Sequence, residues 1–267
     1  MVKVQDILNK IEEFAPLSIK MDGDPTGFQI GDRQQSVKKV MTTLDVRPKV
    51  VQEAIDNNVD LILAHHPIMF HAPRNLDLSS PQNKMYADLM THNISVNASH
   101  TNLDKAHGGM NDWLMEKLRE HVEIKSSGYI DPDDDYSIGR VGELAEEMDL
   151  VEFAKRVRDA YDLPNLRYVK SELGQKVRRV AIIGGDAGKF YPEVLKSGAD
   201  TFITGDVYYH TAHDMMSNGL NVVDPGHHIE AIFIEKMAHK VQDWANDYHW
   251  DIDIIKSKVN TEPYNFL

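Results

Sequence analysis

The sequence predicts an α/β protein made of two similar, duplicated lobes, each a small sheet flanked by helices. Short apolar segments alternate with helical patterns, and several apolar segments end in polar clusters. A strand–helix–strand pattern also occurs twice with constant spacing. With 42% hydrophobic residues among 267, the chain can bury a substantial core.

The first half of the chain contains the clearest alternation of helices and strands. Residues 3 to 14 carry apolar side chains at helical spacing, which predicts an amphipathic helix. In the predicted helix Pro48–Asn57, Pro48 lies in the first turn, where proline is favoured. The later predicted elements are a strand at Val40–Val46, a helix at Pro48–Asn57, a strand at Val59–Ala64, a helix at Pro81–His92, a strand from Ile94 and a helix opening at Gly108–Asp112.

Two segments of the second half repeat the first half at one offset. Val37–Val40 matches Val177–Val180, and Asn58–Leu63 matches Gly198–Ile203, both shifted by 140 positions. This shared, gapless offset favours an internal duplication over chance similarity of two strand–helix–strand patterns. In the second copy, Gly205 and Asp206 occupy the positions of His65 and His66.

The duplication sets the predicted domain limits. We expect the first lobe to comprise residues 1–125 together with a C-terminal helical region, 228–267, and the second lobe to comprise 136–227. Residues 126–135, which include Asp131-Pro-Asp-Asp-Asp135, are the predicted acidic linker. The charges of this linker would keep a loop solvated, and a calcium site is disfavoured because the regular EF-hand spacing is missing.

The charge and composition exclude several classes of protein. A formal charge of −13 argues against general nucleic-acid binding, which needs Lys and Arg to neutralise phosphates. No segment has the apolar length of a membrane span, and the N-terminus lacks a signal-peptide pattern. Without cysteines there are neither disulfides nor thiolate metal ligands. We therefore expect a soluble cytoplasmic protein.

The most informative stretch is Leu61-Ile-Leu-Ala-His-His-Pro67. Its apolar run predicts a buried strand, and the proline that follows prevents further strand pairing. His65 and His66 should therefore lie at the carboxyl end of a strand, where open α/β sheets place their ligands. Adjacent imidazoles there could contact two metal ions, or they could form a structural, hydrogen-bonded pair.

Other predicted strand ends add further candidate metal ligands. The segments are His100–Asp104, Gly205–Asp206 and Asp224–Glu230, and in the last of these His227 and Glu230 share a face if a helix starts near Gly226. His228 is an alternative ligand. Three imidazoles with an Asp and a Glu suit Zn²⁺, Fe²⁺ or Mn²⁺ and are enough to hold two ions. Scattered histidines of purely structural role are the alternative.

Two weaker features have structural explanations as well. His210 or His213, after Gly205, could carry protons or contact substrate, or could simply cap or line a helix. Gly184–Gly188 could cradle phosphate, but a tight turn is the simpler interpretation because the Rossmann and P-loop spacings are absent.

Five motifs in order resemble the GTP cyclohydrolase 1 type 2 family, also called Nif-three-like, over nearly the whole chain. They are His65-His66-Pro67 with Phe70, Ser99–Asp104, Gly108–Asp112, Gly205–His210 and Gly226–Glu230. The resemblance implies two divalent metals bound by His65, His66, Asp104, His227 and Glu230 in the cleft between two lobes, and a toroidal homohexamer. The span from Val122 to Val177 is too short for the inserted mid-chain domain of some members. Asp24-Pro-Thr-Gly-Phe-Gln29 departs from the family's usual Asp-Asn-x-Gly-Leu-Gln.

The resulting functional prediction is a dinuclear metal-dependent hydrolase that acts on a nucleotide or another small phosphorylated substrate. Two metals would activate a water molecule, and His210 would be the proton carrier. The ring-opening cyclohydrolase reaction is implied by the resemblance alone. The residues themselves do not distinguish it from phosphoester hydrolysis, because both reactions need the same activated water. A non-catalytic metal-binding scaffold or regulatory protein, assembled as a homo-oligomeric ring, is the alternative.

Overall fold

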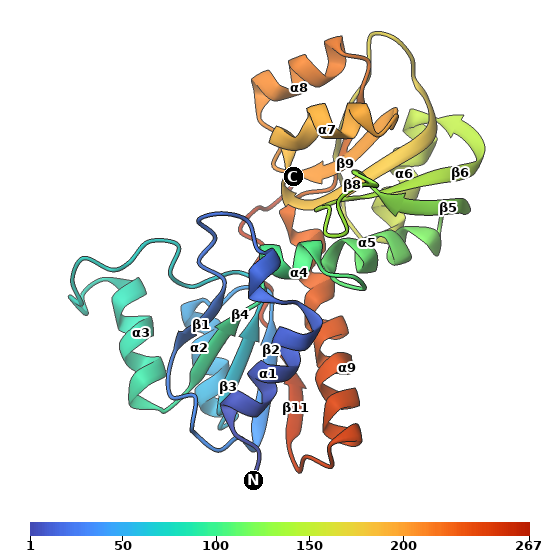
Figure 1. Cartoon of the computed structure of the whole chain (residues 1–267). Coiled ribbons are helices and arrows are strands. Elements are labelled where there is room, and N and C mark those ends of the chain that lie inside the picture. Colours follow the sequence, from blue (N-terminus) through green and yellow to red (C-terminus); the bar gives the residue numbers. More distant parts are fainter. The chain divides into compact units, whose positions relative to one another are not determined.

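A computed structural model describes all 267 residues and divides the chain into two compact units. Unit 1 comprises Met1–Ala106 and Ala231–Thr261. Unit 2 comprises His107–Glu230 and Glu262–Leu267. Each unit is an α/β structure with its own sheet, as the sequence predicts (Figure 1).

Unit 1 contains a five-stranded sheet in the order β1-β4-β3-β2-β11. The strands β4, β3, β2 and β11 run parallel, and β1 pairs antiparallel with β4 at one edge. Its strands are Gly27–Ile30 (β1), Lys39–Thr43 (β2), Leu61–Ala64 (β3), Ser95–Ala98 (β4) and Asp253–Lys256 (β11). Its helices are Val4–Phe14 (α1), Leu17–Ile19 (η1), Pro48–Asp56 (α2), Pro81–Thr91 (α3), Thr101–Lys105 (α4) and Ile232–Asp247 (α9).

Alternate side chains of the central strands of unit 1 bury into two different layers, as the two-residue period of a strand requires. Met41 and Ile62 pack with α2 and α3 on one face of the sheet. On the opposite face, Thr42 donates a hydrogen bond from Oγ1 to the carbonyl oxygen of Ile234 in α9, at 2.8 Å. Because both faces are covered, β3 is buried along its whole length, as expected for a parallel strand.

Unit 2 contains a six-stranded sheet in the order β5-β6-β8-β9-β10-β7. Strands β8, β9 and β10 are parallel, and the remaining pairings are antiparallel. Its strands are Ile124–Tyr129 (β5), Arg140–Asp149 (β6), Arg167–Val169 (β7), Lys176–Asp186 (β8), Thr201–Gly205 (β9) and Asn221–Asp224 (β10). Its helices are Met110–Arg119 (α5), Leu150–Ala160 (α6), Gly188–Phe190 (η2), Tyr191–Lys196 (α7), Tyr209–Ser217 (α8) and His227–Ala231 (η3), the last ending one residue inside unit 1.

The unit 2 sheet is also covered on both faces. Helices α7 and α8 pack on one face through an apolar cluster that includes Val194 and Met215, together with Phe202 of β9. Helices α5 and α6 pack against β6 and β8 on the other face, as Figure 1 shows. The parallel strands β8, β9 and β10 therefore form the covered centre of the sheet.

The duplication predicted from the 140-residue offset is confirmed by a repeated hydrogen-bond motif. In unit 1 the Asp60 carboxylate accepts bonds from the backbone N–H groups of Lys38 and Lys39, at 2.7 and 2.9 Å. In unit 2 Asp200 accepts the same two bonds from Arg178 and Arg179, each at 3.0 Å. In both copies this aspartate precedes the second strand of the repeated unit and binds backbone N–H groups at or near the beginning of the first strand.

The observed limits of the units correct the predicted domain boundaries. The predicted acidic linker, residues 126–135, instead belongs to unit 2, where β5 pairs with β6 and the loop after β5 connects the two strands. The first lobe therefore ends at Ala106 and not at residue 125, and the chain returns to unit 1 at Ala231. Residues 122–177 are accounted for by β5, β6, α6, β7 and the start of β8, so they contain no inserted domain.

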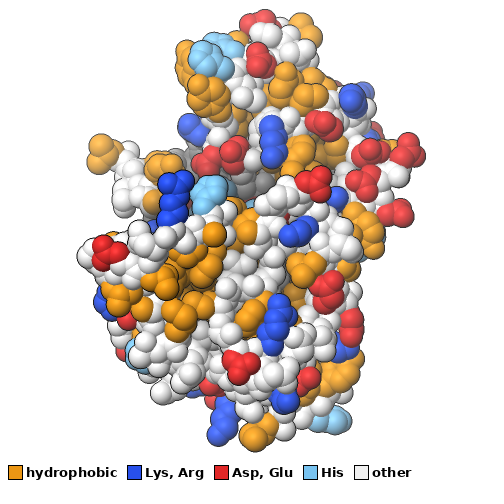
Figure 2. All heavy atoms as spheres, turned by 60° about the vertical axis from the view of Figure 1, so that its left-hand side comes forward, with side chains coloured by type: hydrophobic (Ala, Val, Ile, Leu, Met, Phe, Trp, Pro, Cys, Tyr) orange, Lys and Arg blue, Asp and Glu red, His pale blue; other side chains and the backbone are white.

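No helix has the length and apolar character needed to cross a membrane. On the face drawn in Figure 2, Lys and Arg side chains occur singly among acidic ones and form no continuous basic surface.

Candidate metal centre

In unit 1, three adjacent parallel strands end in polar residues at the same edge of the sheet. Asp45 follows β2, His65 and His66 follow β3, and α4, which contains Asp104, follows β4. The proline after the histidine pair ends the strand, so both side chains leave the regular pattern at this edge. We refer to His65, His66, His100 and Asp104 as the unit 1 cluster.

The rings of His65 and His66 are held in fixed orientations by hydrogen bonds at Nδ1. His65 is fully buried, and its Nδ1 lies 2.7 Å from the carbonyl oxygen of Ser99. Because a carbonyl only accepts, Nδ1 of His65 carries the proton. His66 Nδ1 lies 2.7 Å from Asp45 Oδ1, and Asp45 Oδ2 accepts a bond from Thr261 Oγ1. Metal-binding histidines are commonly oriented in this way, with Nε2 left as the ligand atom.

The separation of His65 and Asp104 fits a shared metal ion. His65 Nε2 lies 3.6 Å from Asp104 Oδ1, and both residues are buried. Two ligand atoms about 2.1 Å from one ion, at a tetrahedral angle, lie about 3.4 Å apart. The unit 1 cluster therefore has the donor type and the spacing of a divalent metal site.

A third imidazole, His100, completes the unit 1 cluster. Possible ligand atoms of His65, His66 and His100 all lie within 4.8 Å of one another. His100 Nδ1 lies 2.9 Å from Asp24 Oδ1, so a carboxylate orients this ring too. Asp24 also accepts bonds from the backbone N–H and the hydroxyl of Thr101. Burial opposes ionisation of Asp24, but the hydrogen bonds from His100 and Thr101 outweigh it and hold the pKa of this carboxyl below its usual range.

In unit 2, His227 and Glu230 lie together in the short helix η3, directly after β10. We call them the unit 2 pair. His227 Nε2 is 3.2 Å from Glu230 Oε2, and Glu230 is buried. Residues three apart are eclipsed in a 3₁₀ helix, which explains why the two side chains meet. His227 Nδ1 lies 2.8 Å from Asp206 Oδ2, so a carboxylate orients this imidazole as well.

Glycines at the ends of β8 and β9 provide the space that the unit 2 pair needs. A Cβ atom on Gly184 would lie 2.5 Å from Glu230 Oε1. One on Gly185, whose φ is +64°, would lie 3.1 Å from the same oxygen and 3.3 Å from His227 Nε2. A Cβ on Gly205 would lie 2.7 Å from the backbone nitrogen of His227. These glycines therefore allow His227 and Glu230 to lie close to the ends of β8 and β9. The sequence analysis did not predict this role for Gly184–Gly188.

The Gly108–Asp112 motif supports the same site in unit 2 through its buried polar residues. The Asn111 side chain accepts a hydrogen bond from the backbone N–H of Gly184, at 2.9 Å, and so fixes the glycine that faces Glu230. Asp112 forms a bidentate ion pair with the buried Arg140, with distances of 2.7 and 2.8 Å. This motif is structural and holds the end of β8 in place.

The predicted site residues thus fall into two groups, one in each unit. His65, His66 and Asp104 lie together in unit 1, and His227 and Glu230 lie together in unit 2. Glu230 lies close to His227, as the sequence predicts for residues three apart. His210 is exposed on α8, where its ring contacts Tyr208 and Tyr209. His213 contacts Tyr209 on the same helix. The role of His210 as proton carrier stays a prediction.

His100 and Asp206 lie within the candidate segments predicted from the sequence but had no assigned role there. Sequence reasoning missed two further carboxylates that orient imidazoles, Asp24 and Asp45. A signal existed for Asp206, because the duplication aligns it with His66. Asp45 lies near the end of the predicted strand Val40–Val46, next to the histidine strand, and parallel strands bring polar residues together at such ends. Nothing local in the sequence links Asp24 to His100.

The fold and these side chains define a class of α/β proteins with two similar sheets and with histidine and carboxylate clusters at the carboxyl ends of parallel strands. A sequence model of the family described as Duf34/NIF3 (NGG1p interacting factor 3) matches residues 2–263. The chain belongs to this family, which confirms the resemblance.

Relatives and solved structures agree with this assignment. The chain is 40% identical to a Streptococcus pneumoniae protein named GTP cyclohydrolase 1 type 2 homolog, over 98% of each sequence. A Bacillus subtilis protein of the same name is 30% identical over 370 aligned positions that cover 100% of this chain and 99% of the relative. A Bacillus cereus protein related to NIF3 superposes with a TM-score of 0.91 at 26% identity, covering 100% of this chain and 99% of the other. Reduced HcgD from Methanocaldococcus jannaschii gives 0.79 at 28% identity, covering 97% and 98%.

Proposed function

We propose that this protein is a dinuclear metal-dependent hydrolase that acts on a nucleotide. In this proposal the ligands are His65, His66 and Asp104 from the unit 1 cluster together with His227 and Glu230 from the unit 2 pair. The observation that carries the proposal is the common arrangement of the three ligand imidazoles, each held at Nδ1 by an oxygen acceptor so that Nε2 is left for a metal.

Chain connectivity supports the assignment of both groups to one centre. The chain passes from unit 1 to unit 2 two residues after Asp104, and back directly after Glu230. Within unit 1, the ring of Phe233 lies 5.7 Å from that of His65. Glu230 precedes Phe233 by three residues, and a chain of that length spans at most about 11 Å. Glu230 is therefore close along the chain to a residue that contacts His65, and this closeness supports the proposal of one centre.

The donor set agrees with catalytic divalent metals. Three imidazoles and two carboxylates suit Zn²⁺, Fe²⁺ or Mn²⁺, and two such ions would supply Lewis-acid activation of water near neutral pH. The residues of the chain would bind and orient. Asp45, Asp206 and the Ser99 carbonyl would hold the rings, while Gly184 and Gly185 would leave room for Glu230. His210 would be the proton carrier if substrate reached the first turn of α8.

The relatives' name, GTP cyclohydrolase 1 type 2 homolog, suggests the substrate class. A nucleotide is therefore the first substrate to test, and both ring opening and phosphoester hydrolysis should be followed. The net charge of −13 means that bound cations would be an important source of attraction for a phosphorylated ligand.

Metal analysis combined with turnover tests the proposal. The purified protein should contain two equivalents of divalent metal per chain and should convert at least one member of a nucleotide panel. Asp104→Ala and Glu230→Ala should each lose metal and turnover, whereas His71→Ala, which alters an exposed histidine of unit 1, should change neither. Absence of bound metal, or equal losses in the His71 variant, would contradict the assignment of the ligands.

The alternative, a metal-binding scaffold or regulatory protein in a homo-oligomeric ring, predicts a different combination of results. The protein would then bind two metals through the same residues but convert none of the nucleotides. Size determination in solution, with and without chelator, would show whether assembly depends on the metals. Turnover that disappears in Asp104→Ala would exclude this alternative.

A further inference from the structure

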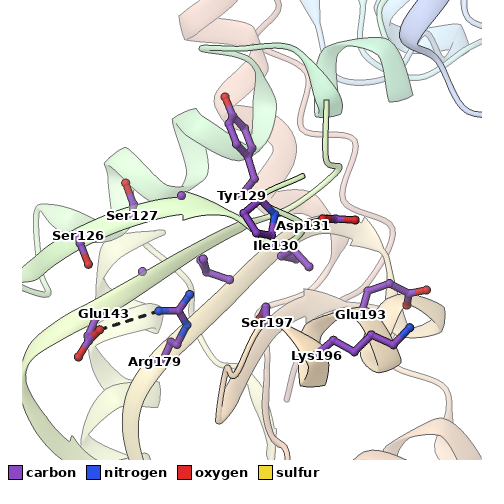
Figure 3. A pocket seen from close by; sticks show the side chains of 14 residues that line it. Ser126, Ser127, Tyr129, Ile130, Asp131, Glu143, Arg179, Glu193, Lys196 and Ser197 are labelled. Atoms are coloured by element: carbon purple, nitrogen blue, oxygen red, sulfur yellow. Dashed lines mark ion pairs between the residues drawn. The ribbon is translucent and has the colours of Figure 1, made fainter. Parts of the chain in front are cut away.

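Unit 2 contains a cavity of about 550 Å³ that none of the residues of the candidate metal centre lines. It lies over β5, β6 and β8, beside α7 (Figure 3). Its volume falls within the range of small-molecule sites in proteins. Its lining combines an apolar floor, which includes Val141 and Ile130, with charged side chains and serine hydroxyls.

Strand register determines which side chains face this cavity. Ser126 of β5 pairs with Glu143 of β6, and Glu143 pairs with Arg179 of β8, so these three residues form one row across the sheet. Directly paired residues project from the same face. Val141, two residues before Glu143, packs in the apolar cluster under α7, so the row also faces α7.

The cavity remains open because small residues and a short helix leave this end of the sheet uncovered. Helix α7 contributes Lys196 to the lining, and Ser197 follows it, and both lie across from Arg179 in Figure 3. On β5, a Cβ atom built on Gly128 would meet nothing within 4 Å. A side chain could therefore be introduced at Gly128 without displacing an existing group.

Among the polar residues that line the cavity, Arg179 has a side-chain donor without a hydrogen-bond acceptor. Its Nε is buried and has no hydrogen-bond partner. Its Nη1 lies 3.9 Å from Glu143 Oε2, which is too long for a hydrogen bond. Leaving a buried donor of this kind unsatisfied costs about 1–3 kcal/mol. The Arg179 side chain as a whole is 34% exposed, so an acceptor in the cavity can reach the rest of its guanidinium.

We propose that this cavity is a binding site for a small organic carboxylate. The carboxylate binds the guanidinium of Arg179 in the bidentate geometry that arginine favours, and an apolar body rests on Val141 and Ile130. Three acidic residues, Asp131, Glu143 and Glu193, also line the cavity. Their charges disfavour phosphorylated ligands, which carry more negative charge than a single carboxylate. The site is therefore distinct from the proposed nucleotide site.

Titration of the full-length, ¹⁵N-labelled protein with benzoate tests this proposal directly. The Nε–H signal of Arg179 can be followed by NMR and assigned by its loss in Arg179→Lys. Benzoate should shift this signal in a saturable way, while benzamide, which has the same ring without the charge, should not. Phenyl phosphate should bind more weakly than benzoate.

Three variants separate a specific site from general anion binding. Arg179→Gln should weaken benzoate binding by about tenfold or more, as expected for loss of a charge-assisted hydrogen bond. Arg178→Gln is the matched control, since this neighbouring arginine is exposed and projects from the opposite face of β8; it should leave affinity unchanged. Gly128→Leu should block binding by filling the cavity, without lowering the melting temperature.

Several results would overturn the proposal. They are an Arg179 signal that benzoate does not shift, equal binding of benzamide and benzoate, tighter binding of phenyl phosphate, and equal losses in the Arg178 and Arg179 variants. The melting temperature serves as the check on folding. A variant that keeps the melting temperature of the wild type but loses benzoate binding has lost the cavity site alone.

Discussion

Single residues of the candidate centre act through the groups that orient them. The rings of His66, His100 and His227 are each held by an aspartate, and that of His65 by a backbone carbonyl. An imidazole with a fixed ring plane loses less freedom when it binds a metal, so in the proposed centre these partners would raise affinity without contacting an ion. The histidine pair was predictable because it ends an apolar strand. Asp24 was not, because its contact with His100 arises only when two separate segments come together, whereas Asp45 and Asp206 lay near predicted strand ends.

At Gly184, a single methyl group should disturb metal binding. In Gly184→Ala the new Cβ would lie 2.5 Å from Glu230 Oε1, so either the strand or the buried carboxylate must shift. Overpacking of this kind costs about 1–3 kcal/mol, which corresponds to roughly tenfold or more in metal affinity if the ligand moves. Competition with a chromophoric chelator measures this affinity. Gly188→Ala is the control, since its Cβ would make only ordinary contacts at 3.6 Å or more, and an equal loss there would contradict the explanation.

Asp24 should stabilise unit 1 in a pH-dependent way. Its pKa lies below the reference value of 3.8 in the folded protein, so the unfolded chain takes up this proton first as the pH falls. The contribution of Asp24 is therefore complete above the reference pKa and is lost as the pH falls through the lowered value. In metal-free protein, Asp24→Asn should cost about 2 kcal/mol near pH 7. Urea unfolding should show this difference shrinking below pH 4, and a constant difference would contradict the assigned cause.

Secondary-structure elements explain both the success and the failure of the sequence predictions. The parallel strands β2, β3, β8 and β9 are apolar runs between polar boundaries, so they and their duplication were predictable. Strand β5 has the sequence Ile-Lys-Ser-Ser-Gly-Tyr, is largely exposed, and lies at the sheet edge. Because β5 buries no apolar face, its sequence lacks the alternation of apolar and polar residues that predicts a strand. Most of it was therefore assigned to the linker. The turn of His227–Ala231 is 3₁₀, which the helical pattern of the next segment concealed.

The repeated aspartate motif should contribute about equally to the local stability of each unit, and only to that of its own unit. Removing the Asp60 carboxylate leaves the N–H groups of Lys38 and Lys39 without their acceptor, and removing that of Asp200 does the same for Arg178 and Arg179. Asp60→Ala should therefore speed amide hydrogen exchange in β2 and β3 but not in β8 and β9, and Asp200→Ala should do the reverse. Each loss should correspond to about 1–3 kcal/mol of local stability. Exchange that rises in both sheets of either variant would contradict the structural independence of the two copies.

At the scale of the whole molecule, the chain crosses from unit 1 to unit 2 and later back again. The predicted ligands therefore belong to different units. Asp104 precedes the first crossing by two residues, and Glu230 immediately precedes the second. An α/β fold with two similar sheets was predictable from the repeat, and the shared centre stays a prediction. The limits of the units were not predictable, because they depend on which sheet accepts β5 and on the return of α9 to unit 1.

A metal centre that draws ligands from both units should couple their unfolding. A ligand that binds only the folded protein stabilises it by about 2.7 kcal/mol at a free concentration one hundred times Kd. If the centre needs both units folded, this stabilisation is lost when either one unfolds. Metal-loaded protein should thus melt in one cooperative calorimetric transition. Protein treated with chelator should melt at lower temperature, with the transitions of the two units separated.

Variants identify which interaction produces this coupling. His66→Ala, in unit 1, and Glu230→Ala, in unit 2, should each make metal-treated protein melt like chelated protein, and the double variant should add little to either single change. Strictly additive effects would mean that each unit binds its metal alone, which would contradict a shared centre. His71→Ala should retain the single transition, so that loss of coupling is traced to the ligands and not to the removal of a histidine.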